Sequence, residues 1–220
     1  MSRTPIAART LPNYTQTEEL CNMLTHMLGI ILGVTVLILC VAKAAVHHDL
    51  DGLVTSAIYG FSMILLYTVS TVYHGWPKND NKKILQVIDH CTIYLLIVGT
   101  FVPICLTKLR EQDPLATWVI FLGICLICAI GIVFTAIDFK KYQVLSMLGY
   151  LSPWLLLFAR QELSMIFPPQ FMQLIIGGGA AYTVGAILYG TKKPFMHAVF
   201  HVFILLGSVL HFLAIWMYCL

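Results

Sequence analysis

Histidines and one aspartate at particular spacings are the residues of this chain that could perform chemistry. His197 and His201 are four residues apart, so on a helix they lie on one face and could bind a single metal ion. Ser70 and His74 have the same spacing, which places a hydroxyl beside a third imidazole. Three neutral imidazoles with one open position are typical of a catalytic zinc site. We expect Zn2+ bound by the three histidines, with Asp89 holding or deprotonating the water on the metal.

Further polar residues lie near this set in the sequence. Glu19, Asn22 and His26 share one helical face, and we interpret them as supporting residues, with a direct role for Glu19 or His26 left open. His90 follows Asp89, and about 100° of helical rotation separates neighbouring residues. We therefore expect only one of the two to point into the interior, and choose Asp89, with His90 in support.

The composition predicts a membrane protein. Of the 220 residues, 59% are hydrophobic and 10% are charged, whereas soluble domains carry about 25% charged residues. The net charge of +3 is too small to indicate nucleic-acid binding. The first twenty residues lack the apolar stretch of a cleavable signal peptide, so the first hydrophobic run is expected to remain as a span. Thr15 and Glu18 have the spacing of a capping box at the start of a helix.

Seven segments are long and apolar enough to cross a bilayer, which takes about 20 residues. We expect an all-α fold, a seven-helix transmembrane bundle over residues 21–220, preceded by a short cytoplasmic tail over residues 1–20. The connections are short, so sequence neighbours should pack antiparallel. The predicted spans are about 22–46, 53–74, 84–107, 115–137, 142–160, 170–190 and 195–219.

The basic residues orient the bundle, because Lys and Arg are favoured in cytoplasmic loops. With a cytoplasmic N-terminus and an outside C-terminus, nine of the thirteen lie on the inner side: Arg3, Arg9, Lys78, Lys82, Lys83, Lys140, Lys141, Lys192 and Lys193. In this orientation four helices bring their imidazoles or carboxylate to one layer at the inner end. Ionisable groups inside a membrane are costly and indicate a functional site. The alternative is a hydrogen-bonded polar plug that holds the helices together.

Other features are interpreted as structural. His211 lies about 15 Å further along its helix than His201, so we expect a hydrogen-bonding role inside the bundle. Cys125 and Cys128 fall within an apolar helix and are interpreted as packing residues. Gly29 and Gly33 have the spacing that lets membrane helices approach closely.

Four segments carry a resemblance to a known family: EELCNMLTHMLG, STVYH, DHCTIYLLIVGTFVP and HAVFHVFILLGSVLHF. In this order they resemble the motifs of the hemolysin III family, within the larger group of progestin and adipoQ receptors. The resemblance runs from about residue 15 to the end of the chain, and it is greatest to the compact bacterial inner-membrane members. It implies zinc bound by His74, His197 and His201, Asp89 in contact with the metal-bound water, and Ser70 close by.

The resemblance also implies a function at the membrane. Related members are thought to be ceramidase-like lipid hydrolases, and bacterial members are linked to membrane-lipid homeostasis. We expect a zinc-dependent hydrolase of lipid amide or ester bonds, with a membrane lipid as substrate or ligand. A non-enzymatic, receptor-like regulator with structural zinc is the alternative, and a cytolytic pore is a further one. The first two need the same ligands, so the sequence does not separate them, and it leaves the protein partners unknown.

Overall fold

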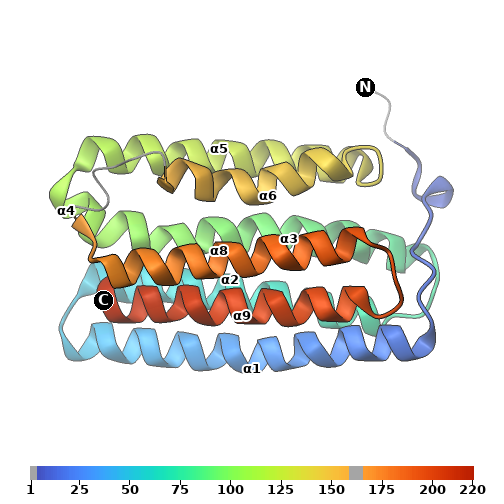
Figure 1. Cartoon of the computed structure of the whole chain (residues 1–220), viewed down its shortest axis with the longest axis horizontal. Coiled ribbons are helices and arrows are strands. Elements are labelled where there is room, and N and C mark those ends of the chain that lie inside the picture. The colour runs from blue at the N-terminus through green and yellow to red at the C-terminus, as the bar shows by residue number, and fades with distance from the viewer. Residues whose placement is uncertain (1–3, 159–165) are drawn as a thin grey trace.

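The computed structural model describes residues 4–158 and 166–220, and the long elements in these ranges are α-helices that run along one common axis (Figure 1). The long helices are α1 (Gln16–Val46), α2 (Leu50–Gly75), α3 (Asp80–Ile104), α5 (Pro114–Asp138), α6 (Gln143–Phe158), α8 (Pro169–Gly190) and α9 (Met196–Tyr218). The short elements are the 3-10 turn η1 (Ile6–Ala8), the π-helical turn η2 (Cys105–Leu109) and α4 (Arg110–Gln112). The all-α prediction is confirmed.

Six of the described helices, all except α6 among the long ones, are long and apolar enough to cross a membrane. The predicted span 142–160 corresponds to α6, and its last two residues, which include Arg160, lie outside the described residues. Arg3, one of the basic residues used to orient the bundle, also lies outside them. The seventh span and the orientation therefore stay predictions. The helices otherwise begin and end close to the predicted bounds. The largest difference is at α1, which begins at Gln16 because its first turn is polar and capped rather than apolar.

Side-chain caps fix where several helices begin. Thr15 accepts a hydrogen bond from the backbone of Glu18, whose carboxylate accepts from Thr15 in return, so the predicted capping box is confirmed. Asp49, Asn79 and Asp113 cap α2, α3 and α5 through a side-chain oxygen that accepts from a backbone N–H of the first turn. These caps satisfy backbone donors that the first turn of a helix leaves free.

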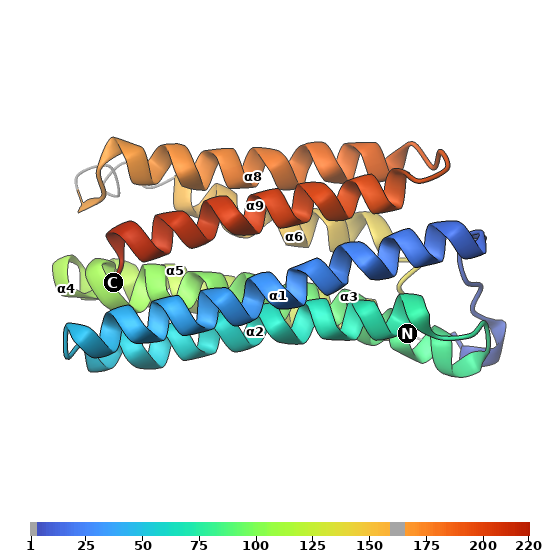
Figure 2. The same cartoon turned by 90° about the horizontal axis from the view of Figure 1, so that it is seen from below.

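Close packing joins α1 to α2 (Figure 2). A Cβ atom at Gly29 would overlap the ring of Tyr67, and one at Gly33 would press on Ile64 of α2. The expectation that these glycines allow close helix approach is confirmed. Helix α9 packs on both α1 and α8, and α3 packs on α2 and α5.

Large apolar side chains cover the outside of the bundle. Ile31 on α1 is 65% exposed, Leu126 on α5 62% and Ile187 on α8 65%. Such a surface is unfavourable in water and suits contact with lipid tails. Together with the six apolar helices, it identifies a multi-pass membrane protein.

The chain alternates direction, so α1, α3, α6 and α9 begin at one end of the bundle and α2, α5 and α8 finish there (Figure 1). We call this the site end. The C-terminal end of α9 lies at the opposite end. The site end brings together the first turns of α1, α3 and α9 with the last turn of α2, which are the segments that carry the predicted site residues.

Candidate metal centre

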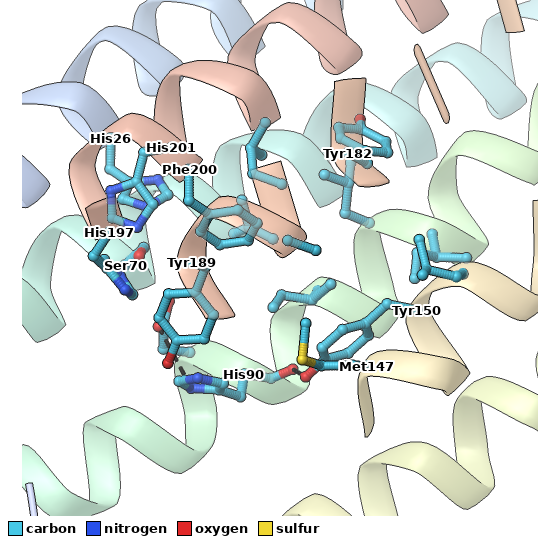
Figure 3. A pocket seen from close by; sticks show the side chains of 18 of the residues that line it. His26, Ser70, His90, Met147, Tyr150, Tyr182, Tyr189, His197, Phe200 and His201 are labelled. Carbon is cyan, nitrogen blue, oxygen red and sulfur yellow. Dashed lines mark hydrogen bonds and ion pairs between the residues drawn. The ribbon is translucent and has the colours of Figure 1, made fainter. Parts of the chain in front are cut away.

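Four imidazoles meet at the site end. Ring nitrogens of His26, His74 and His201 lie within 4.8 Å of one another, and all three residues are buried. The ring centre of His197 lies 5.0 Å from that of His74 and 4.3 Å from that of His201. Figure 3 shows His26, His197 and His201 grouped at one end of a cavity, with Ser70 beside them. The three histidines positioned to bind a metal are thus His26, His74 and His201. His26, expected only as a supporting residue, belongs to this group, and the predicted ligand His197 lies beside it.

The His74 ring is held by its Nδ1 atom. This nitrogen lies 2.8 Å from Oε2 of Glu19, and the other carboxylate oxygen lies 2.9 Å from Nζ of Lys82. A carboxylate paired with a lysine only accepts hydrogen bonds, so the proton belongs on Nδ1 and a lone pair remains on Nε2. Nε2 is buried and has no hydrogen-bond partner among the described residues. It is therefore free to bind a metal ion.

The other two predicted ligands are held in the same manner by different residues. The Thr25 hydroxyl donates to backbone carbonyls of its own helix and lies 3.1 Å from Nδ1 of His201, so it can accept from that nitrogen. The Tyr14 hydroxyl lies 3.0 Å from Nδ1 of His197. Burial raises the pKa of Tyr14, which keeps this phenol neutral. Histidines that bind metals typically have their second nitrogen fixed by such a partner.

His26 differs from these three rings. Its Nδ1 is buried without a hydrogen-bond partner in the described part of the chain, and so are both side-chain polar atoms of Asn22. Unpaired buried polar atoms cost about 1–3 kcal/mol each. Unpaired nitrogens on His26 and His74 and a donor set of neutral imidazoles fit a metal ion of the zinc type.

The cavity beside the histidines has a volume of about 130 Å³. Asp89 and Ser70 line it together with His26, His197 and His201, while its other walls are mostly apolar side chains of α3, α6, α8 and α9. His90 lines it too, so the expectation that only one of the two neighbours faces the interior is wrong. The reason is that α3 packs against both α2 and α5, so more than one of its faces is covered by other helices. The ring centre of His90 lies 3.9 Å from that of Phe139, which directly follows α5.

Comparisons with known proteins identify the family of the chain. A family model described as "Haemolysin-III related" matches residues 14–212. The chain belongs to the hemolysin III family. This family lies within the progestin and adipoQ receptor group, and one matching relative, the human "Monocyte to macrophage differentiation factor", is 29% identical over 91% of this chain and 84% of its own length.

Two bacterial members of the hemolysin III family are more similar. The "Hemolysin-3 homolog" of Bacillus subtilis is 36% identical over 94% of this chain and 96% of its own length. The "Hemolysin-3" of Bacillus cereus is 35% identical over 92% of both chains. No solved structure matches the chain.

Three residues of the site, Tyr14, Thr25 and Lys82, were missed by sequence reasoning in this hemolysin III protein. Lys82 was assigned to a loop of basic residues, but α3 begins at Asp80 and Lys82 is 2% exposed, paired with Glu19. The signal that could have found it is the acid at position 19, which needs a counter-charge once it is buried. Tyr14 precedes the first helix, and nothing in its sequence context indicated a role.

Proposed function

We propose that the protein is a zinc-dependent hydrolase of amide or ester bonds in membrane lipids, with a role in membrane-lipid homeostasis. One observation carries the proposal. Three histidines are each fixed at Nδ1 by a different side chain. Two of them, His197 and His201, line an apolar cavity inside the membrane bundle, and the ring centre of the third, His74, lies 5.0 Å from that of His197 and 5.3 Å from that of His201. Ligands beside an apolar cavity are what hydrolysis of a lipid requires, because the acyl chain must lie next to the reacting group.

His74, His197 and His201 would hold the ion through Nε2. Bound zinc lowers the pKa of a coordinated water to about 7 and polarises a carbonyl. Asp89, on the wall of the same cavity, accepts the proton of the attacking water and returns it to the leaving atom. Ser70 lines the cavity at the same level and orients water or substrate.

Glu19, Thr25 and Tyr14 keep the three rings in orientation and in one tautomer. Lys82 offsets the charge of Glu19 in the bundle interior. We further propose that the site end faces the cytoplasm, because eight of the nine basic residues predicted to be cytoplasmic lie in described segments at this end, in the tail, the connections and the first turn of α3.

A second function is supported by the position of His26. If its nitrogen joins the other imidazoles on the ion, the coordination is closed by four protein ligands, which is typical of a structural zinc site. The protein would then be a non-enzymatic regulator that links α1, α2 and α9 through the metal.

The first test is the metal content of the detergent-purified protein, measured by elemental mass spectrometry beside His201→Ala. We expect about one zinc per chain, lost in the variant. Reconstituted protein should then release fatty acids from lipid. Metal binding without any lipid turnover would favour the regulator, and no metal in either preparation after zinc is supplied would contradict both proposals.

A further inference from the structure

A second cavity adjoins the apolar one at the site end. It has a volume of about 910 Å³ and is formed by the N-terminal tail, the α5–α6 connection and the α8–α9 connection. We call it the vestibule. The two cavities share the side chains of Phe139, Gln143, Met147, Tyr189 and His197. A predicted metal ligand therefore lies at the boundary between an apolar volume and a polar one.

The vestibule is positively charged. Five basic side chains line it, against the two acids Glu18 and Asp138, which gives a formal excess of three positive charges. The basic residues are Arg9, Lys140, Lys141, Lys192 and Lys193.

The acids of the vestibule are already engaged. Glu18 accepts a hydrogen bond of 3.0 Å from the backbone of Phe195, and Asp138 accepts from the hydroxyl of Thr4. Arg9 donates to two backbone carbonyls at the end of α5. The four lysines of the vestibule, in contrast, have no acidic partner among the described residues. Within residues 4–158 and 166–220, no carboxylate lies within 4.0 Å of their ammonium groups.

Membrane orientation alone does not account for this arrangement. Lys82 and Lys83 lie at the same end, yet each pairs with a carboxylate, Lys82 with Glu19 and Lys83 with Asp80. Lys78 donates to the carbonyl of Tyr14, much as Lys140 in the vestibule donates to the hydroxyl of Thr10. Cytoplasmic lysines that only orient a chain need not surround a cavity. The α8–α9 connection is also fixed in place, since the contact between Phe195 and Glu18 ties it to the first turn of α1.

We infer that the lipid acted on at this site carries an anionic headgroup of the phosphate type, which binds among the vestibule lysines while the acyl chain enters the apolar cavity. The inference rests on the proposed function and specifies its substrate class. The bond to be cleaved then lies at the boundary, beside His197. Water adds to the carbonyl carbon, the bond to the lipid's oxygen or nitrogen breaks, and that atom takes the proton. The products are a fatty acid and the de-acylated lipid.

The test measures binding, so it does not depend on turnover. Full-length zinc-loaded protein in detergent is titrated with phosphatidylglycerol and with phosphatidylcholine of the same acyl chains, and bound lipid is counted by native mass spectrometry. We expect phosphatidylglycerol to bind more tightly, and its binding to weaken as salt is added. Lys192→Gln with Lys193→Gln should lower phosphatidylglycerol affinity about tenfold and leave phosphatidylcholine unchanged.

The matched control is Lys78→Gln with Lys83→Gln, which removes the same charge from the same end outside the vestibule. Equal binding of the two lipids, or an equal loss in the control pair, would overturn the inference. Inorganic phosphate that displaces the lipid at similar concentration would assign the vestibule to a soluble anion, and would also overturn it.

The two proposals fail separately. Selective binding of phosphatidylglycerol with no release of fatty acid would keep the anionic ligand and remove the enzyme. Hydrolysis of both lipids at equal rates would keep the enzyme and contradict the headgroup selectivity. Repeating the titration in Asp89→Asn, which should bind lipid without cleaving it, keeps turnover from depleting the ligand.

Discussion

Glu19 and His74 are joined across two helices by a contact of 2.8 Å between a carboxylate oxygen and the imidazole Nδ1. The same carboxylate binds Lys82, which itself donates to the carbonyls of His74 and Trp76 at the end of α2. One acid near the start of α1 therefore fixes both the ring of a predicted ligand and the connection between α2 and α3. This relationship makes the orientation of His74 dependent on a charge outside the ligand set.

Replacing that charge should weaken metal binding. In Glu19→Gln the amide oxygen can still accept from His74, but the ring loses its anionic partner and Lys82 loses its counter-charge. We expect zinc affinity to fall about 10–100-fold, measured by competition with a chromogenic chelator. Glu18→Gln is the control, because glutamine preserves the capping box one residue away. Equal affinity in Glu19→Gln and the wild type would contradict a supporting role for Glu19.

The ligand set can be tested by comparing two histidines. His197 has its Nδ1 held by Tyr14, whereas the Nδ1 of His26 has no partner among the described residues. We expect His197→Ala to lose the metal and His26→Ala to keep about one zinc per chain, by elemental mass spectrometry. The reverse result would give the set His26, His74 and His201, and loss in both would favour the closed site of a regulator.

Tyr14 should support the predicted ligand His197 as a neutral hydrogen-bond partner. Burial raises its pKa above the ordinary value of 10.0, so the phenol keeps its proton while the pH rises through about 7 to 9. Tyr14→Phe removes the contact with His197, and we expect a smaller loss of zinc affinity than in Glu19→Gln, because no charge is lost. The ratio of wild-type to variant affinity should stay constant across this pH range. A ratio that changes with pH would mean that the Tyr14 hydroxyl titrates there.

Much of the fold follows from the sequence because a bilayer imposes simple constraints. Apolar runs of sufficient length must be helical, and polar caps such as Thr15 and Asp113 mark where they begin. The grouping of His74, His197 and His201 at one end could be predicted for the same reason, since alternating helices bring every second terminus to one side. The depth of a residue in the membrane can be estimated from its position along a predicted span.

The parts that could not be predicted depend on rotation and on tertiary contacts. Both Asp89 and His90 line the cavity, and this depends on how the neighbouring helices pack on α3, which the sequence does not show. Lys82 resembles any interfacial cation until Glu19 is seen within 2.9 Å of it. Tyr14 lies in a segment without periodicity, so no pattern relates it to α9.

The packing of α1 on α2 should be sensitive to a single methyl group. Alanine at Gly29 would overlap the ring of Tyr67, whose hydroxyl lies 2.9 Å from that of Ser208 on α9. We expect Gly29→Ala to destabilise the detergent-solubilised protein by about 1–3 kcal/mol, seen as a lower Tm. The matched control is Gly179→Ala on α8, because nothing lies within 4 Å of the added atom. There alanine should be neutral or slightly stabilising. Equal Tm values for the two variants would contradict the close contact.

Asp89 distinguishes an enzyme from a regulator most directly. It lines the cavity with His197 and His201 but belongs to neither the ligand set nor its supporting partners, so Asp89→Asn should keep the metal and the fold. If Asp89 accepts the proton of the attacking water, fatty-acid release in proteoliposomes should fall about 10²–10⁴-fold. Zinc content and Tm, measured on the same preparation, serve as the control for structure. A regulator predicts no fatty-acid release in either protein. Release that continues in Asp89→Asn at the wild-type rate would exclude Asp89 as the base and leave hydrolysis to other groups of the cavity.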